Sequence, residues 1–491
     1  MDILPNKKKF IQLADSSCRI PVFGEERILN LDPFLLFQEL YKNSEQSFLF
    51  ESGKGPIETS QYSIFGNSNS RHIKFFGSQA SLYTDGILKK KFTKINEAFK
   101  LLNFEQDTHQ VDYLPHFWGG WVGFVGYEAI TLFENISLNT NQNLPDLSFM
   151  EVERIFIYDH SSNKLKFILS GLNKTKESDY EEFIVEIKQV WIEVGKALKT
   201  LNYDSPYSNE KKNTFISTTP KSLLNKEDYI KKVNRAKTYI SEGDIYQANI
   251  SQKFEAPFNQ DPFILYKRLR KINPSPFSGF LKYDDLVLVS SSPERLIKIS
   301  GNKIESRPIA GTRPRSNIIE KDRALMVELL LNEKERAEHL MLVDLERSDL
   351  GRLCKPGSVE VTDFMFLEKY SHVTHIVSNI SGCLLPDQEI FKILKAIFPG
   401  GTITGCPKIR CMEIINELES VPRGPYSGSF GYIGFAPYMD LNIIIRSIII
   451  HNETASFHVG AGVVADSVPE KEYFETLDKA APMIEALSME K

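Results

Sequence analysis

The richest apolar stretch of the chain limits the folds that it can adopt. This stretch, residues 441–450, contains Asn442 and is interrupted by Arg446 and Ser447, and no run in the 491 residues reaches the ~18 apolar residues that a bilayer crossing needs. It therefore predicts a buried β-strand in a globular protein. Arg446 must then pair with an anion or lie at a strand end, because an unpaired buried guanidinium is too costly. A ligand carboxylate and a structural salt bridge are equally good partners for it at this point.

Composition excludes several functional classes. Hydrophobic residues make up 42% of the chain and charged residues 25%, which is ordinary for a soluble globular protein. A net charge of -5 argues against a nucleic-acid-binding surface. The five cysteines form no C-x-x-C pair, so neither a disulfide framework nor a zinc site is indicated. Residues 1–10 lack the apolar region of an export signal, so we expect a cytoplasmic enzyme or binding protein.

A polar segment divides the chain into two regions. Residues 201–221 have the composition of an exposed connection, with Ser, Asn, Asp, Lys and Pro close together. We therefore expect an N-terminal region at 1–205, a linker at 206–221 and a C-terminal region at 222–491. In the first region, residue periodicity predicts strands at 47–50, 73–76 and 154–158 and a helix at 179–201.

Local signals are sharper in the C-terminal region. Asn225 is a plausible N-cap residue, and Gly243 provides the left-handed position that ends a helix. The sequence Ser467-x-x-Glu470 is typical of a capping box. The expected elements are a helix from Asn225 to Gly243, a strand at 245–254, a helix at 321–345, a helix at 407–418 and a helix that begins after Ser467.

Two of these helices carry glutamates in pairs spaced i and i+3, so that each pair projects from one helix face. Two such pairs facing each other would form a cage of oxygen atoms that suits Mg²⁺. The alternative is that these glutamates are solvated and pair with neighbours such as Lys334 and Lys471. The four residues are Glu335, Glu338, Glu472 and Glu475.

Two further features each have a structural alternative. The glycine-rich segment 398–410 runs into a predicted helix, and backbone N–H groups at such a junction attract anions. It lacks the Lys-Ser/Thr of a P-loop, so a carboxylate is a better guest than a nucleoside triphosphate, and a plain tight turn is the alternative. His375 lies on a strand-like alternation, where a lone histidine is more often a core residue than a catalyst.

Several longer motifs occur together in a fixed order. They are Ser292-Pro-Glu-Arg, Arg307-Pro-Ile-Ala-Gly-Thr-Arg-Pro-Arg315, Arg336-Ala-Glu-His-Leu-Met-Leu-Val-Asp-Leu345, Phe398-Pro-Gly-Gly-Thr402, Arg423-Gly-Pro-Tyr426 and Gly460-Ala-Gly-Val-Val-Ala-Asp-Ser467. From residue 226 to 487 the chain thereby resembles the chorismate-utilising enzymes. More narrowly, it resembles component I of anthranilate synthase and of aminodeoxychorismate synthase.

The resemblance implies an α+β fold in which two antiparallel β-sheets pack together, flanked by helices, with the active site between the two halves. It assigns the four paired glutamates to Mg²⁺, directly or through water. It makes Glu294 the general acid that protonates the departing ring hydroxyl. His375 and Thr402 are implied to lie beside that leaving group. The residues implied to hold the substrate are Tyr426, Arg446, Gly460, Gly462, Gly311 and Thr312.

Gln247 indicates that the nucleophile is ammonia. Family members that add water use a lysine base at this position. A neutral glutamine cannot deprotonate water, whereas ammonia needs no deprotonation before it attacks. The chain shows no Gly-x-Cys-x-Gly sequence for glutamine hydrolysis. A separate glutamine amidotransferase subunit is therefore implied as the ammonia source.

Ala310 bears on the choice between the two ammonia-using branches. Aminodeoxychorismate synthases place a lysine here that attacks ring carbon 2. With alanine, ammonia itself should add at carbon 2 and give anthranilate after loss of pyruvate. Segments 370–373 and 468–472 also resemble anthranilate synthase, whereas 273–280 and 401–405 resemble the branch that leads to para-aminobenzoate and folate. We favour anthranilate; a silent regulatory subunit is a remote alternative, because the site residues are all retained.

A regulatory site is also implied. Tryptophan-inhibited relatives bind the amino acid against a Leu-Leu-Glu-Ser segment and an Asn-Pro-Ser-Pro-Tyr-Met segment. Here Phe50 replaces the second leucine, and phenylalanine and serine replace the tyrosine and methionine. We therefore expect weak or absent inhibition by tryptophan. The implied site consists of Glu51, Ser52, Pro276, Phe277 and Ser278.

Overall fold

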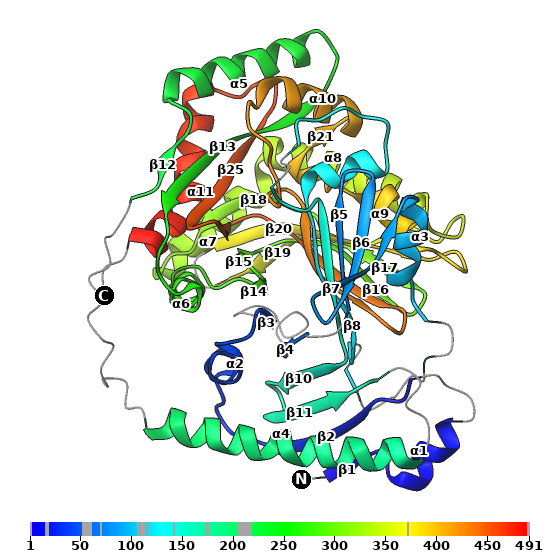
Figure 1. The fold of residues 1–491 in the computed structure, drawn as a ribbon. Coiled ribbons are helices and arrows are strands. Elements are labelled where there is room, and N and C mark those ends of the chain that lie inside the picture. The colour runs from blue at the N-terminus through cyan, green and yellow to red at the C-terminus, as the bar shows by residue number, and fades with distance from the viewer. Residues whose placement is uncertain are drawn as a thin grey trace.

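The computed structural model describes residues 2–14, 19–51, 61–68, 71–105, 108, 114–115, 117–140, 143–171, 177–203, 219–370 and 373–488. Two β-sheets form the body of the molecule (Figure 1). The long helix Glu177–Tyr203 (α4) lies along one end, below the N-terminal strands, and Lys226–Ser241 (α5) lies at the opposite end. Within the described residues, no helix has the length and apolarity that a membrane crossing requires.

The first sheet contains thirteen strands among the described residues, and all of its strand pairs are antiparallel. It combines both regions of the chain, because β3 from the first region pairs with β14 from the second. In spatial order its strands are β1 (Asp2–Leu4), β2 (Val22–Arg27), β11 (Lys164–Leu169), β10 (Arg154–Asp159), β4 (Tyr62–Asn67), β3 (Gln46–Glu51), β14 (Phe277–Tyr283), β15 (Leu286–Ser292), β24 (Ser447–His451), β25 (Thr454–Val463), β13 (Gln247–Pro257) and β12 (Lys221–Ser222), with β21 (Gly405–Cys406) beside β13.

The second sheet contains twelve strands in the described part of the chain and is also antiparallel. It too combines both regions, because β8 pairs with β22. In spatial order its strands are β18 (Ile309–Pro314), β20 (Val373–Cys383), β17 (Lys303–Ser306), β16 (Arg295–Ser300), β23 (Tyr438–Ile443), β22 (Ser429–Gly434), β8 (Gly120–Val125), β9 (Leu147–Val152), β5 (Arg71–Phe76), β6 (Gln79–Thr84) and β7 (Ile87–Phe92), with β19 (Glu360–Lys369) beside β20.

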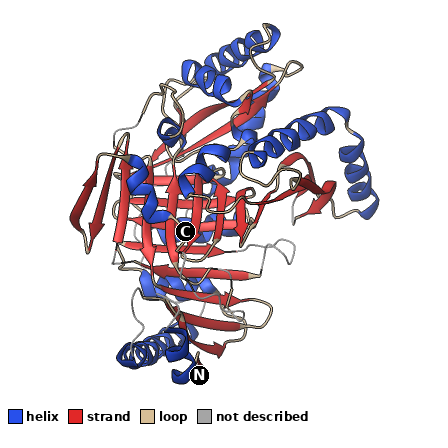
Figure 2. Ribbon diagram, turned by 90° about the vertical axis from the view of Figure 1, so that its right-hand side faces the viewer, coloured by secondary structure: helices blue, strands red, loops and turns tan. Residues whose placement is uncertain are grey.

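Helices cover the outer faces of both sheets (Figure 2). Besides α4 and α5, the α-helices are α1 (Lys7–Ala14), α2 (Pro33–Tyr41), α3 (Ile95–Phe99), α6 (Pro262–Ile272), α7 (Ile319–Leu331), α8 (Glu333–Gly351), α9 (Ile390–Ile397), α10 (Lys408–Leu418) and α11 (Pro469–Ser488). Short 3₁₀ helices are η1 (Lys100–Leu102), η2 (Tyr127–Leu132) and η3 (Gly401–Ile403).

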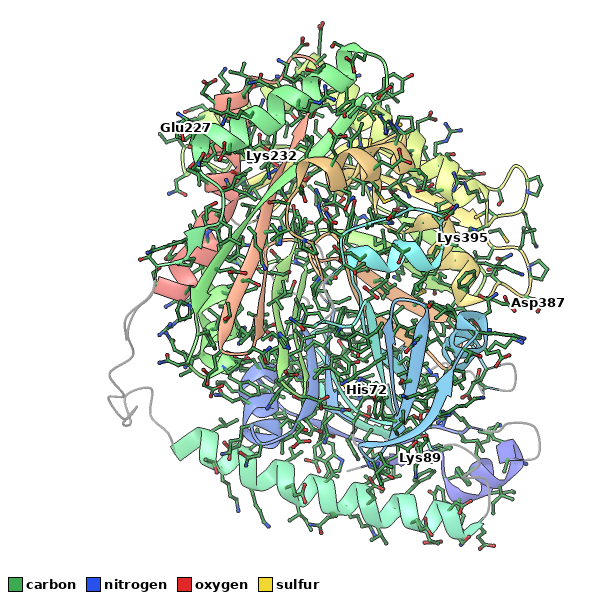
Figure 3. All side chains as sticks on the ribbon, turned by 45° about the horizontal axis from the view of Figure 1, so that its top comes forward. His72, Lys89, Glu227, Lys232, Asp387 and Lys395 are labelled. Carbon is green, nitrogen blue, oxygen red and sulfur yellow. The ribbon has the colours of Figure 1, made fainter. Side chains whose placement is uncertain are left out.

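The sheets pack face to face over a shared core that includes Phe48, Phe124 and Phe430. A second core lies between the first sheet and helices α1, α2, α4, α6 and α11, and a third lies between the second sheet and helices α3, α8 and α9. Side chains fill the space between these layers (Figure 3). The arrangement confirms the expected α+β fold with two packed antiparallel sheets flanked by helices.

Burial on both faces of a sheet explains the apolar run near the C-terminus. In β24, Ile448 and Ile450 belong to the core under the helices, whereas Ile449 belongs to the core between the sheets. A strand that is covered on both faces needs apolar residues at consecutive positions instead of an alternation. The expected burial of this segment is therefore correct.

The prediction of a single strand at 441–450 is wrong. β23 ends at Ile443 in the second sheet, and β24 begins at Ser447 in the first sheet, so the chain changes sheets between them. Arg446 lies in this link with a φ of 49°, a left-handed conformation that is strained for a non-glycine residue. It therefore lies beside a strand end and not inside a strand.

The prediction of one helix at 321–345 is also wrong. Asn332 has an extended backbone, which ends α7, and its side chain accepts a hydrogen bond from the Glu335 N–H at 3.0 Å, which begins α8. The helix expected after Ser467 is α11, but there the Val468 carbonyl accepts the first backbone bonds while the Ser467 hydroxyl accepts from the Val464 N–H. The capping box thus does not form at Ser467.

Most other expected elements are present with small shifts. The strands predicted in the first region fall within β3, β5 and β10, and the predicted helix falls within α4. Asn225 caps α5 by accepting from the Asp228 N–H at 2.8 Å. The predicted linker lies mostly outside the described residues, so the division into two regions stays a prediction.

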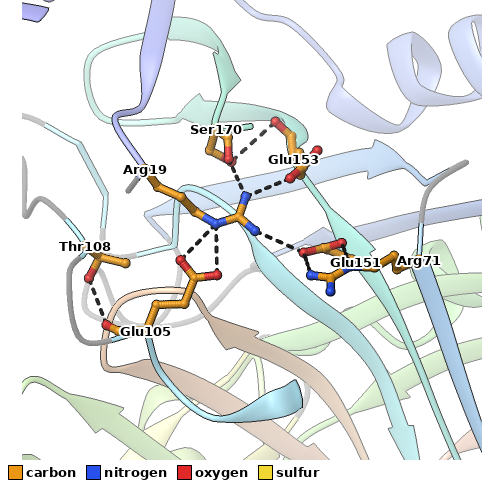
Figure 4. Close-up of polar contacts among 7 residues, drawn as sticks. All are labelled: Arg19, Arg71, Glu105, Thr108, Glu151, Glu153 and Ser170. Atoms are coloured by element: carbon orange, nitrogen blue, oxygen red, sulfur yellow. Dashed lines mark hydrogen bonds and ion pairs between the residues drawn. The ribbon is translucent and has the colours of Figure 1, made fainter. Parts of the chain in front are cut away.

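A buried arginine ties the first strands to both sheets (Figure 4). The Arg19 side chain is fully buried, and its nitrogens lie 2.9 Å from Glu105, 3.1 Å from Glu151 and 2.7 Å from Glu153. It also donates to the Ser170 carbonyl oxygen at 2.6 Å. Because Glu105 and the Glu151–Glu153 segment are far apart in the sequence, Arg19 acts as a charged clamp between them.

Candidate active site

A cavity of about 670 Å³ opens where the chain crosses between the two sheets. Glu294 lies on the crossing from β15 to β16, and Arg446 lies on the crossing from β23 to β24. Backbone hydrogen bonds join the two crossings: the Ile443 N–H donates to the Glu294 carbonyl at 3.0 Å, and the Ser291 N–H donates to the Arg446 carbonyl at 3.2 Å. A carboxyl group and a guanidinium group are thereby presented to one cavity.

The structure brings together every residue that the sequence nominated for catalysis, substrate binding and metal binding. They come from strands β13, β18, β20 and β25, helices α8 and α11, η3 and the connections between strands. The residues that line the cavity from this set are Gln247, Glu294, Ala310, Gly311, Thr312, Glu335, Glu338, His375, Thr402, Tyr426, Arg446, Gly460, Gly462, Glu472 and Glu475.

Glu294 has the environment of a carboxylic acid that keeps its proton near neutral pH. Its side chain is buried, and its Oε1 atom has no hydrogen-bond partner among the described residues. Burial raises the pKa of Glu294 to about 7, while the nearby Thr402 hydroxyl and Lys479 act in the opposite direction. The neutral acid is therefore well populated at the pH where an acid catalyst would need it.

His375 is buried on β20 and is held in one tautomer. Its Nδ1 atom lies 2.9 Å from the Thr312 hydroxyl and 3.3 Å from the Gly311 carbonyl oxygen. Because a carbonyl only accepts, this geometry places the proton on Nδ1 and leaves Nε2 as an acceptor. Burial and the nearby Arg446 lower the pKa of His375 to about 4, so the ring is neutral. His375 is thus buried, as expected for a core residue, and it also lines the cavity.

Arg446 is a cation without a carboxylate partner in the described structure. Burial lowers the pKa of its guanidinium, and no acidic side chain offsets that effect. Tyr426 lies in the same cavity, with its ring stacked on His458 at a centroid distance of 5.1 Å. A half-buried guanidinium without a carboxylate partner is suited to bind an anionic ligand.

Gly460 and Gly462 allow the walls of this corner to approach closely. A Cβ atom at position 460 would lie 2.8 Å from the Tyr426 hydroxyl oxygen, and one at 462 would lie 2.6 Å from Gln247 Nε2. Both distances are shorter than real Cβ contacts, so a side chain at either position would have to displace the polar group that it meets. The two glycines therefore permit Tyr426 and Gln247 to reach the cavity.

The four paired glutamates face one another across the cavity from α8 and α11. Burial, opposed by Lys334, raises the pKa of Glu338, and the neighbouring carboxylates add to the rise. Such mutual repulsion is what a divalent cation would relieve, and the oxygen donors suit Mg²⁺. Two of the four now have a monovalent cation at hydrogen-bonding distance, because Arg313 lies 3.1 Å from Glu335 and Lys479 lies 2.8 Å from Glu475. Within the described residues, no three His, Cys, Asp or Glu side chains already converge as a metal centre.

Sequence reasoning missed several residues of the cavity. Lys479 donates to the Gly460 carbonyl at 2.9 Å and lies one helical turn after Glu475, a spacing that would have placed it on the same face of α11. Asn249 lies two residues after Gln247 on β13, so strand alternation would have predicted a shared face. Arg313 and His458 also line the cavity.

The glycine-rich segment contributes side chains instead of an anion-binding helix end. From this segment, Thr402 and Ile403 line the cavity. Close to the start of α10, Lys408 Nζ lies 2.6 Å from Asp349 Oδ2. A Cβ atom at Gly400 would lie 3.0 Å from Ile443 Cδ1. These contacts support the tight-turn alternative for this segment.

A second cavity of about 400 Å³ lies between the sheets near the implied tryptophan site. Glu51, Pro276, Phe277 and Ser278 line it, and Ser52 lies outside the described residues. The Glu51 carboxylate accepts a hydrogen bond from the Tyr266 hydroxyl at 2.7 Å and lies 2.9 Å from an Arg270 nitrogen. The acidic group that would receive an ammonium ion is therefore already partnered.

Comparison with known proteins places this cavity in a family. A family model described as chorismate binding enzyme matches residues 30–485. The chain belongs to the family of chorismate binding enzymes. It is 38% identical over 473 residues to anthranilate synthase component 1 of Acetivibrio thermocellus, covering 95% of each chain.

Relatives with a second activity are equally similar. The chain is 38% identical to aminodeoxychorismate synthase component 1 of Bacillus subtilis, covering 95% of this chain and 97% of the relative. Among solved structures, anthranilate synthase component I of Streptococcus pneumoniae matches with a TM-score of 0.73 and 32% identity, covering 94% of this chain and 99% of that one. The protein is thus a chorismate-utilising enzyme, and overall similarity does not separate the two products.

Proposed function

We propose that this enzyme aminates chorismate and releases anthranilate and pyruvate, with Mg²⁺ as cofactor and ammonia from a separate glutamine amidotransferase subunit. The observation that carries the proposal is the neutral, buried acid Glu294 in the same cavity as the unpaired cation Arg446. Chorismate is a dianion that must lose a ring hydroxyl. It therefore needs a cation to bind a carboxylate and an acid to release hydroxide as water.

Arg446 and Tyr426 bind one substrate carboxylate in this proposal. A guanidinium can donate two parallel N–H bonds to a carboxylate, which fixes the orientation of the ligand as well as its position. The four glutamates, Glu335, Glu338, Glu472 and Glu475, hold Mg²⁺, which supplies a positive charge for the second carboxylate. Arg313 and Lys479 contact Glu335 and Glu475 in this structure, so they would have to release these oxygens for the glutamates to hold the metal.

Glu294 then acts as the general acid. It gives its proton to the departing hydroxyl, which leaves as water, and becomes a carboxylate. His375 stays neutral beside it, and its Nε2 acceptor orients that hydroxyl while Nδ1 keeps its proton. Gln247 lines the path of the nucleophile as a neutral group, so ammonia is not converted to ammonium by a neighbouring acid at this position.

Ala310 supports anthranilate as the product. Its methyl group lines the cavity and cannot form a covalent bond with the ring, so ammonia itself attacks the ring carbon next to the carboxylate-bearing carbon. Loss of pyruvate then yields the aromatic amine. The names of the relatives describe one component of a larger enzyme, which supports a separate amidotransferase partner.

The alternative product is 4-amino-4-deoxychorismate, and it rests on two observations. The Bacillus subtilis relative with that activity is as similar as the anthranilate synthase of Acetivibrio thermocellus. Phe277 and Ser278 also depart from the tryptophan-binding pattern.

One assay tests both products. Purified protein is incubated with chorismate, MgCl₂ and ammonium chloride, and anthranilate is followed by its fluorescence. A parallel reaction contains aminodeoxychorismate lyase, which converts the alternative product to para-aminobenzoate. Glu294→Gln is the matched control, because it keeps the size of the side chain but removes the acid. Anthranilate in the wild type alone supports the proposal, para-aminobenzoate replaces it with the alternative, and no product from either reaction rejects chorismate amination.

A further inference from the structure

A buried ion pair behind the cavity connects three of its walls. Arg423 is 3% exposed, and Glu419 is 6% exposed. The guanidinium binds this carboxylate through two nitrogens, at 2.8 Å from Nε and 2.7 Å from Nη2. Neither residue lines the cavity, and neither was nominated by the sequence as a site residue.

All five N–H groups of the Arg423 guanidinium have acceptors. Besides the two bonds to Glu419, Nη1 donates to the Ile403 carbonyl at 2.9 Å and to the Ser427 hydroxyl at 3.1 Å. Nη2 also donates to the Asn249 carbonyl at 2.7 Å. A guanidinium has no more donors than these, so its hydrogen-bonding capacity is fully used.

Three of these acceptors lie in or beside the cavity wall, where Ile403 and Asn249 themselves line the cavity. Ile403 follows Thr402, which lies beside the general acid. Asn249 is on β13 with Gln247, and Ser427 follows Tyr426. The Arg423 guanidinium also lies 5.5 Å from the centre of the Tyr426 ring.

Glu419 gives the ion pair a second hydrogen bond to β13. Its Oε1 atom accepts a hydrogen bond from the Ser251 N–H at 2.7 Å. The Arg423 backbone N–H is held in turn by Glu128, at 2.8 Å. The pair is therefore fixed from several sides, and small shifts of its atoms are costly in a buried environment.

We propose that Arg423, together with Glu419, is a positioning residue that sets the spacing of Thr402, Gln247 and Tyr426 around the substrate. This inference rests on the proposed function for the reaction that it serves, but its structural part does not. Lysine cannot replace the arginine in this role, because its donors come from one nitrogen and cannot reach three separate segments in a plane. Misplacement of catalytic groups by about 1 Å can cost on the order of 10²-fold in rate.

The test compares Arg423→Lys with Arg19→Lys. Both replacements keep a buried positive charge and lose a planar fork, but Arg19 lies in the clamp far from the cavity residues. We expect Arg423→Lys to lower kcat for chorismate consumption on the order of 10²-fold, with a much smaller change in KM. Arg19→Lys should lower the melting temperature and leave kcat unchanged.

Amide hydrogen exchange gives a readout that does not need activity. In Arg423→Lys, exchange should accelerate in segments 247–251, 402–405 and 425–429, whereas in Arg19→Lys these segments should exchange as in the wild type. If Arg423→Lys does not fold, Ser427→Ala, which removes one of the five bonds, should show a smaller change of the same kind in its own segment and in kcat.

The outcomes separate the two proposals. Unchanged exchange in the three segments, or an unchanged kcat in a folded Arg423→Lys, overturns the positioning role. A wild-type enzyme that does not consume chorismate overturns the proposed function instead, while the exchange result still decides whether the pair holds the three walls.

Discussion

Arg446 offers a direct test of whether the cavity is built for an anion. The variant is Arg446→Met, which keeps an unbranched side chain of similar reach but removes the charge. In the described structure this guanidinium has no carboxylate partner, so the free protein bears the cost of its partial burial without compensation. We therefore expect the variant to be at least as stable as the wild type.

Chorismate binding, in contrast, should be weaker in Arg446→Met than in the wild type. Removing one partner of a buried charge pair in a complex costs about 2–5 kcal/mol. At 1.36 kcal/mol for each factor of ten, this corresponds to a rise in KM for chorismate of roughly 30- to 5,000-fold. Steady-state kinetics by loss of chorismate absorbance gives KM, and differential scanning calorimetry gives the melting temperature.

Arg19→Met is the control for a buried arginine whose role is structural. Arg19 contacts three carboxylates, so its removal leaves buried negative charge and should cost about 3–5 kcal/mol of stability, with little effect on KM. The reasoning about Arg446 would be refuted if Arg446→Met lost as much stability as this control, or if its KM stayed at the wild-type value.

Four further predictions concern the acid, the metal, the partner and regulation. Because the neutral form of Glu294 is the active one and burial raises its pKa to about 7, kcat at constant free ammonia should fall as the pH rises through that value. Glu294→Gln should lose roughly 10²- to 10⁴-fold in kcat. A flat pH profile would remove Glu294 from this role. Glu338→Gln should abolish turnover with little loss of fold, and full activity at low MgCl₂ would contradict the metal assignment. Glutamine should support turnover only after an amidotransferase subunit is added, which is checked by comparing glutamine and ammonium chloride with the single chain. Tryptophan should inhibit weakly or not at all, because the Glu51 carboxylate is already bound by Arg270 and Tyr266; inhibition at low micromolar concentration would show that the pocket accepts the amino acid.

Local signals in the sequence were sufficient for parts of the site. The i and i+3 spacing of Glu335 and Glu338 depends only on helical geometry, so their shared face could be read directly. The same is true of the cap at Asn225. The break at Asn332 was missed although Asn332-x-x-Glu335 is itself a capping signal, because the apolar spacing on both sides fits one long helix.

Such local signals do not encode the pairing of strands that are distant in the sequence. Residues 441–450 look continuous because three isoleucines stand on each side of Arg446 and Ser447, so nothing in the periodicity marks the change of sheet at Arg446. The pairing of β3 with β14 joins residues more than two hundred positions apart, and no local pattern encodes it. The convergence of the nominated residues on one cavity was expected from the family resemblance alone, because spacing constrains each helix but not their approach.

The interleaving of the two regions has a consequence for work with fragments. A chain cut at its polar connection would not yield two self-contained pieces, because β14 and β22 would each lose the neighbour that now covers one long edge. Exposed central strands of this kind pair readily with other chains. We therefore expect residues 222–491 to aggregate when they are expressed alone. The two segments should be produced as one polypeptide or together in the same cell, where each can supply the other's missing strands.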